Sequence, residues 1–489
     1  MSLTEDQIIG LAPDASSIKS GKDLAVASKW VLRGASDKAL WGHCQGSGKL
    51  PYQSQVDLQN IAFKCSCPSH KFPCKHGLAL LLLYARGPEL FTKSEEPEWV
   101  SDWLNKRTER VAKKVEKESK PVDVDAQAKR AGARARKVAG GIEDLQVWLK
   151  DLIRNGLLTL PERSYEYWQQ PSKRMVDAQA PGLAGMVKAL GDINYFDDSW
   201  KHKVLNQLSR IFLVSEAYKN LDTLPEDFQK ELRLLVGFTQ SKEELLAQEG
   251  VSDHWLVLAR TLEEDEQLTI ERNWLYGINN KRFALILQFF VNRQLPELSF
   301  MPGTAIDAEL VFYQGVQNQR ALMKQQKGMV DFKLPGFHET IARALESFSG
   351  VIIQNPFYER VPLLMGNVRF VRNNQQYYFI SERSLSGVEA NNTNETLSLS
   401  ESKILDSTMS SDRSLSGVKA NLKMSETDNT LNEVEACKVA VTTETVFRLL
   451  AVTGGRPCNM FVLADENEVE PMAVWVGHNF IPLNYGIQK

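Results

Sequence analysis

The sequence has no apolar stretch long enough to cross a membrane. Its longest apolar run, residues 77–85, has nine residues, whereas a membrane-spanning helix needs about 20. The first ten residues contain Glu5 and Asp6 and no basic segment, which is untypical of a secretory signal. Cysteine is scarce, with six among 489 residues, so the chain is not a disulfide-stabilised secreted protein. We therefore expect a cytoplasmic protein with no membrane contact, whose thiols stay reduced.

Recognisable catalytic motifs are also missing. Residues 46–49 read Gly-Ser-Gly-Lys, but His43 stands where a phosphate-binding loop needs its first glycine, and Leu50 stands where it needs serine or threonine. No zinc-protease, serine-hydrolase or dinucleotide-binding pattern occurs in a suitable context. We therefore expect that the protein is not an enzyme. The alternative is an enzyme whose site, in the C-terminal part, carries no known motif.

Cysteine and histidine are concentrated in one short part of the chain. Seven of the thirteen lie within residues 43–76. In a reducing compartment such a cluster favours metal binding over disulfides. The central segment, 64–77, reads Lys-Cys-Ser-Cys-Pro-Ser-His-Lys-Phe-Pro-Cys-Lys-His-Gly. It contains a C-x-C pair and a C-x-H pair six residues apart, and zinc prefers four thiolate or imidazole ligands in a tetrahedron.

The residues around these pairs predict two short strands followed by a helix. Residues 52–58 and 60–64 have the composition of strands, with a turn near Gln59. Residues 77–84 predict a buried helix that ends at Gly87-Pro88. Cys74 and His76 would then lie at the start of this helix, where the positive end of the helix dipole favours a thiolate.

The pattern C-x-C-x6-C-x-H on a β-β-α frame resembles the SWIM zinc finger. Residues 40–48, Leu-Trp-Gly-His-Cys-Gln-Gly-Ser-Gly, and residues 173–184, Lys-Arg-Met-Val-Asp-Ala-Gln-Ala-Pro-Gly-Leu-Ala, are similar to segments of a bacterial SWIM-containing family. The resemblance implies that one Zn²⁺ ion is bound by Cys65, Cys67, Cys74 and His76. Because four protein ligands leave no open position for water, this zinc would be structural.

The resemblance also implies an interaction module for protein or DNA. Related bacterial proteins look like partners of AAA+ ATPases and of von Willebrand A-type proteins, so a protein partner of this kind is expected. Two other readings of the cluster stay open. His70 is a rival ligand, and His43 with Cys44 is a candidate second metal pair. That pair lacks two further ligands, which favours a role in a strand or core.

Basic residues are concentrated just after the finger. Residues 104–140 contain twelve Lys or Arg against five Asp or Glu, while the whole chain has a net charge of −3. The stretch predicts solvated helix, broken near Pro121 and ended at Gly140-Gly141. One interpretation is a soluble connector. The other is a nucleic-acid surface formed with Lys64, Lys71 and Lys75 of the finger.

Periodic apolar residues predict the remaining elements. Helical stripes are formed by Ala25, Val26, Trp30 and Val31, by Leu145, Leu149, Leu152 and Ile153, and by Leu205, Leu208, Ile211 and Phe212. Two β-hairpins are predicted, 269–276 with 282–290 and 367–371 with 376–380. A nine-residue segment at 383–391 recurs at 413–421 with eight matches, inside a serine-rich stretch that has no aromatic residue and no proline.

Together these patterns predict an α+β protein. It comprises a small N-terminal β-β-α zinc finger unit, a charged helical linker, an α-helical middle domain and a C-terminal mixed α/β region. The expected bounds are 1–100 for the finger domain with its core at 50–87, 104–140 for the basic linker, 141–268 for the helical domain, and 269–489 for the C-terminal domain, interrupted by a disordered insertion at 382–432.

Overall fold

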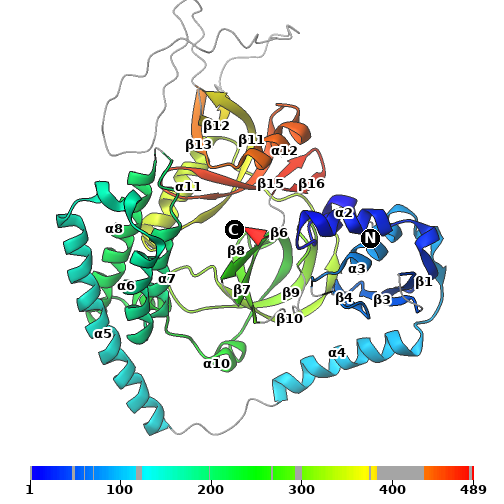
Figure 1. Cartoon of the computed structure of the whole chain (residues 1–489), viewed down its shortest axis with the longest axis horizontal. Coiled ribbons are helices and arrows are strands. Elements are labelled where there is room, and N and C mark those ends of the chain that lie inside the picture. The colour runs from blue at the N-terminus through cyan, green and yellow to red at the C-terminus, as the bar shows by residue number, and fades with distance from the viewer. Residues whose placement is uncertain are drawn as a thin grey trace, which may run out of the picture. The chain divides into compact units, whose positions relative to one another are not determined.

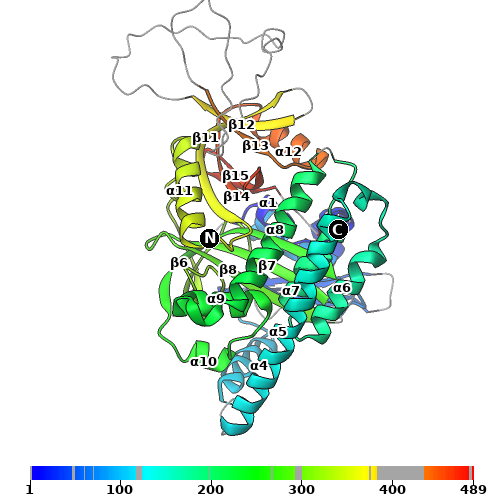
Figure 2. The ribbon, with the colours of Figure 1, turned by 90° about the vertical axis from the view of Figure 1, so that its left-hand side faces the viewer.

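The computed structural model confirms the α+β class and divides the chain into two compact units (Figures 1 and 2). Unit 1 comprises Met1–Thr108, Val251–Leu310 and Met323–Lys489, and unit 2 comprises Glu109–Gly250 and Val311–Leu322. The residues that the structure describes are 3–46, 50–59, 61–69, 71–116, 124–197, 199–265, 268–291, 300–373, 376–382, 434–483 and 487–488.

The finger lies in a five-stranded sheet of order β4-β3-β2-β1-β5 near the N-terminus (Figure 1). Helix α3 (Lys75–Arg86) packs on this sheet together with α1 (Glu5–Ile9) and α2 (Ala15–Leu24), and all of Leu78–Leu83 is buried. The start of α4 (Glu98–Glu116) places Val100 against Trp41. The strands are β1 (Trp30–Ala35), β2 (Ala39–Cys44), β3 (Tyr52–Asp57), β4 (Ala62–Cys65) and β5 (Thr92–Lys93).

The predicted helix around residues 25–31 is wrong. Trp30 and Val31 begin strand β1, in which Trp30 pairs with Cys44. Ala25 and Trp30 are buried in the finger core, but Val31 is 70% exposed. Four apolar residues in seven positions fit a short turn and a strand as well as they fit a helix. Here the pairing with β2 favours the strand.

A second sheet in unit 1 has the order β10-β9-β6-β7-β8. Its central hairpin pairs Trp255 with Gly277 and continues to Asp265 with Leu268. The predicted hairpin of 269–276 with 282–290 is confirmed, since Tyr276 pairs with Phe283 across a tight turn. The strands are β6 (Val251–Asp265), β7 (Leu268–Gly277), β8 (Phe283–Val291), β9 (Ala305–Phe312) and β10 (Ala321–Val330), and β17 (Ile487–Gln488) pairs with β6.

The third sheet has the order β13-β12-β11-β14-β15-β16 and also joins β13 to β15, which closes a ring of strands. Helices α11 (Ile341–Gln354) and α12 (Thr443–Thr453) contribute Ile341, Ala344 and Leu449 to its core. The second predicted hairpin is confirmed as β11 with β12. The strands are β11 (Val361–Asn373), β12 (Gln376–Glu382), β13 (Val434–Val439), β14 (Cys458–Ala464), β15 (Val469–Val476) and β16 (Asn479–Pro482).

The serine-rich segment connects two strands that pair directly. Glu382, at the end of β12, pairs with Val434, at the start of β13. Residues 383–433, which include nearly all of the predicted disordered insertion 382–432, lie outside the described residues. Because both ends of the segment meet in one hairpin, its length adds little to the free energy of closing that hairpin, which grows only with the logarithm of loop length.

Unit 2 is a helical bundle followed by a short helix (Figure 2). Its core includes Leu149, Trp168, Leu183 and Ile211, all buried. Trp168 lies edge-on to Trp148, with ring centroids 6.2 Å apart. The helices are α5 (Val124–Arg154), α6 (Tyr165–Asp177), α7 (Pro181–Lys188), α8 (Trp200–Lys219), α9 (Glu226–Val236) and α10 (Lys242–Leu246).

Two predicted borders of the helical domain are wrong. Helix α5 does not end at Gly140-Gly141 but runs through both. A Cβ on Gly141 would lie 2.4 Å from the Cβ of Ala178, so this glycine allows close packing of α5 on the end of α6. The domain also ends before residue 268, because Val251 already begins strand β6. Residues 124–140, predicted as part of a linker, therefore belong to the first bundle helix.

Candidate functional site: a metal centre in the finger

The four predicted ligands come from two short bends of the chain. Cys65 is the last residue of β4 and pairs with Ser54 of β3. Between Cys65 and Cys67, Ser66 is held to Gln53 twice: its N–H donates to the Gln53 carbonyl at 2.9 Å, and its Oγ accepts from the Gln53 N–H at 2.9 Å. Both cysteines are therefore positioned by the β3–β4 ladder.

The other two ligands lie at the start of α3. Cys74 is the N-cap residue, with extended backbone angles, and its Sγ accepts a hydrogen bond from the Gly77 N–H at 3.5 Å. A sulfur in this position faces the positive end of the helix dipole, which stabilises a thiolate. Only a glycine fits at position 77, because a Cβ there would lie 2.8 Å from the ring of Phe63 on β4. This close approach brings the helix start next to the β4 cysteines.

The four side chains converge on one point. The ligand atoms of Cys65, Cys67, Cys74 and His76 all lie within 4.8 Å of one another. The Sγ of Cys65 is 3.7 Å from Nδ1 of His76. In a tetrahedral zinc site, Zn–S and Zn–N bonds of the usual lengths give a sulfur-to-nitrogen separation of about 3.6 Å. The arrangement thus fits one Zn²⁺ ion bound by three sulfurs and one nitrogen.

Without a cation, the thiols of Cys67 and Cys74 favour their protonated forms. Hydrogen bonding to Cys74, followed by burial, raises the pKa of Cys67 to about 12. Hydrogen bonding to Cys65 is the largest cause that raises the pKa of Cys74 to about 11. Neighbouring thiolates repel each other, so a divalent cation is needed to hold all of them deprotonated. Cys74 and His76 are buried, and the other two ligands are partly exposed.

The candidate second metal pair, His43 with Cys44, does not join the cluster. His70 lies outside the described residues. Cys44 is fully buried in the apolar core below α3, as expected for a strand residue. The ring of His43 points to the other face of the sheet and stacks on Trp99, with centroids 5.8 Å apart. Among the described residues, no second group of cysteine, histidine and acidic side chains is arranged for a metal.

The ring of Tyr52 is a neighbour of the site that the sequence did not indicate. Its centroid lies 4.9 Å from that of His76, so the tyrosine restricts the orientation of the imidazole. Nothing in the local pattern predicts this contact, because Tyr52 begins β3 and meets His76 only through the packing of α3. The hydrogen bonds between Ser66 and Gln53 could not be predicted from the sequence either, because a serine between two cysteines does not indicate its partners.

The basic residues near the finger fall into two groups. Lys64 and Lys75 are exposed and form no ion pair among the described residues. Lys71, in contrast, binds Asp14 with its Nζ 2.7 Å from the carboxylate. Arg107 from the predicted linker lies 3.8 Å from the buried Asp57. Arg134 donates to the carbonyl of Gly237 at 2.9 Å and so caps the end of α9.

Three cysteine thiols and one imidazole converging at a helix start define a zinc-binding module with a Cys3His ligand set. Two family models match the chain, the SWIM zinc finger at residues 55–85 and the SWIM-associated four-helix bundle domain at residues 133–236. The chain is therefore a SWIM-type zinc finger protein, with the zinc site in unit 1 and the associated bundle in unit 2.

Searches of curated proteins and of solved structures found no match to the chain. Within the described residues, no helix combines the length and the apolar character that a membrane span requires.

Proposed function

We propose that this protein is a non-enzymatic interaction protein in which zinc holds the finger in shape. The closed ligand set is the observation that supports this role. Cys65, Cys67, Cys74 and His76 supply four donors, so a tetrahedral Zn²⁺ has no free position for a water molecule or substrate. Such an ion contributes to folding and takes no part in a reaction.

The favoured partner is another protein. By the family resemblance it would be an AAA+ ATPase or a von Willebrand A-type protein. Helix α8 supports a protein partner, because Leu205, Phe212 and Leu213 expose 41–49% of their surface instead of joining the bundle core. Exposed apolar side chains grouped on one helix are typical of protein contacts. Of the stripe predicted from the sequence, Leu208 and Ile211 are buried, whereas Leu205 and Phe212 lie at the surface.

DNA binding through the finger and the basic stretch is the second candidate. Lys64 and Lys75 support it, since both amines are exposed and free of acidic partners among the described residues. The basic residues Lys71, Arg107 and Arg134 weigh against it, because each already interacts with a carboxylate or a carbonyl of the chain. An enzyme with an unrecognised site in the C-terminal part is the third candidate, and among the described residues there no cluster of metal-ligating side chains supports it.

Purification of the intact zinc-loaded chain from its own cells, followed by identification of bound protein and nucleic acid, tests the proposal. We expect one AAA+ or von Willebrand A-type protein to copurify with the wild-type chain, and less of it with a Phe212→Ser variant. The matched control is Phe447→Ser, a substitution of another exposed phenylalanine on α12. Recovery of nucleic acid whose binding falls steeply with salt would favour the DNA alternative. Turnover of a substrate by the purified chain would contradict both.

A further inference from the structure

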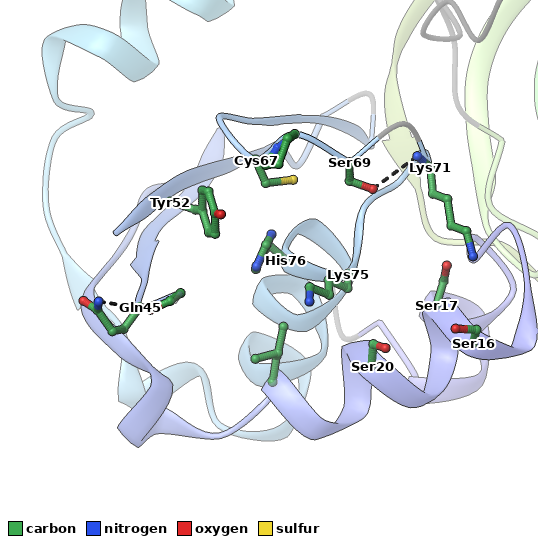
Figure 3. Close-up of a pocket in the computed structure, with 13 residues that line it drawn as sticks. Ser16, Ser17, Ser20, Gln45, Tyr52, Cys67, Ser69, Lys71, Lys75 and His76 are labelled. Carbon is green, nitrogen blue, oxygen red and sulfur yellow. Dashed lines mark hydrogen bonds between the residues drawn. The ribbon is translucent and has the colours of Figure 1, made fainter. Parts of the chain in front are cut away.

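A cavity of about 450 Å³ lies beside the metal centre, within unit 1 (Figure 3). Its walls come from α2, from the loop that follows Cys67, from the first turn of α3 and from the ends of β2 and β3. This volume lies in the range of small-ligand pockets, about 300–1,000 Å³. The cavity is thus large enough for a ligand the size of a mononucleotide.

The described residues that line the cavity carry many hydrogen-bond donors and no carboxylate. Ser16 and Ser20 lie one turn apart on α2, and Lys75 extends its amine from the start of α3 toward the same space (Figure 3). Tyr52 borders the opposite side. Hydroxyl and ammonium groups facing a cavity without acidic side chains favour an anionic ligand.

Asp14, the acidic residue close to this cavity, is already neutralised. Its carboxylate binds Lys71 at 2.7 Å and accepts a hydrogen bond from the Ser17 N–H at 2.7 Å. These contacts hold the pKa of Asp14 below its usual value against the opposing effect of burial. Lys75 has no ion pair among the described residues, so its positive charge remains available to a ligand.

The metal centre gives the cavity a second, negative wall. Three thiolates and one Zn²⁺ carry a net charge of −1, and Cys67 lines the cavity. A purely anionic ligand would be repelled from that side, whereas N–H groups can donate to zinc-bound sulfur. The ring of Tyr52 offers an aromatic surface nearby. The cavity therefore favours a molecule with an anionic end, directed at Lys75, and a flat end that carries N–H donors.

We propose that this cavity binds a phosphate monoester of nucleotide size, with the phosphate held by Ser16, Ser20 and Lys75 and the ring directed toward Tyr52 and Cys67. The site borders the metal centre through Cys67 and needs no catalytic step. It goes beyond the proposed interaction role, since a bound nucleotide is a small ligand distinct from a macromolecular partner.

The test is calorimetric titration of the zinc-loaded full-length chain with AMP, adenosine and inorganic phosphate. We expect saturable binding of AMP, weaker binding of phosphate, and no binding of adenosine. Lys75→Met should weaken AMP binding about tenfold or more, because it removes a charge-assisted hydrogen bond. Lys64→Met, which removes an exposed lysine outside the cavity, should leave it unchanged.

Measuring the zinc content of each variant distinguishes a failure of nucleotide binding from a failure of the finger to fold. Each variant must retain one zinc per chain, which shows that the finger is intact. A Ser20→Ala variant tests the α2 side of the site, and we expect it to weaken AMP binding less than Lys75→Met does. Absence of saturable AMP binding to the zinc-loaded wild type would overturn the inference, as would equal losses in the two lysine variants. An oligonucleotide with a 5′-phosphate that binds better than its unphosphorylated form would support the same site with a chain end as the source of the phosphate.

Discussion

The finger and the helical bundle both contain buried apolar helices, but they differ in the contacts that hold the neighbouring segments in place. In the bundle, Leu149 and Ile211 are buried among other helices, and side-chain contacts such as the Arg134–Gly237 hydrogen bond join the helices directly. In the finger, Leu78–Leu83 of α3 are just as well buried, whereas the described residues between Cys65 and Cys74 form neither helix nor strand. Zinc ligands lie at both ends of this loop. The metal is thus placed where no regular secondary structure orders the chain.

This comparison predicts a local response to loss of the metal. Cys74→Ala removes one zinc ligand and the N-cap of α3. Structural zinc contributes on the order of 10 kcal/mol to the folding of a small finger, so we expect no bound zinc and loss of protease protection within residues 50–87. The bundle at 133–236 should stay protected. Zinc analysis and limited proteolysis measure both effects.

Cys437→Ala is the matched control for that variant. Cys437 is a buried thiol of β13 far from the metal ligands in sequence, with its pKa raised to about 12 by burial. Its loss should leave one zinc per chain. If the Cys74→Ala chain keeps its zinc, or if the bundle unfolds with the finger, the contrast between the two regions is wrong.

A core substitution in the bundle should give the opposite pattern. Ile211→Ala removes a fully buried side chain from α8. We expect the free energy of unfolding of the bundle to fall by about 2–5 kcal/mol, from lost burial and the cavity left behind. Zinc content should not change. Hydrogen exchange of the bundle amides, together with zinc analysis, would show whether the two regions respond independently.

A smaller effect is expected where two bundle helices touch through a glycine. A Cβ on Gly182 would lie 1.9 Å from the backbone oxygen of Leu235 on α9. Gly182→Ala should therefore force α7 away from α9 and cost about 1–3 kcal/mol in thermal unfolding. Gly185→Ala, in the same helix, meets nothing within 4 Å and should be neutral or slightly stabilising. Equal effects of the two substitutions would contradict this packing.

The smallest expected effect is the pH dependence of zinc binding. The pKa values of the Cys67 and Cys74 thiols lie above the usual thiol value, at about 12 and about 11, so both thiols must release a proton when Zn²⁺ binds. Protons therefore compete with the metal, and we expect the zinc affinity to fall as pH falls. Competition with a zinc chelator at several pH values measures this trend, and an affinity that does not change with pH would contradict it.

The sequence predicted the metal site far better than it predicted the borders of the domains. The Cys and His pairs within residues 65–76 indicated a zinc site, and the resemblance to the SWIM finger selected four of the five candidate ligands. The end of α5 was misplaced because Gly140-Gly141 is a helix-stop signal whose packing against Ala178 arises only in three dimensions. The orientation of Tyr52 and the serines of α2 around a cavity also depend on tertiary packing, which local patterns do not encode.

Zinc K-edge X-ray absorption of the purified chain tests the central claim most directly. The account predicts one zinc per chain with three sulfur neighbours at about 2.3 Å and one nitrogen neighbour at about 2.0 Å. A first shell that contains a water oxygen or only two sulfurs would contradict it, because the ion would then have an open position and the finger would not be closed by Cys65, Cys67, Cys74 and His76.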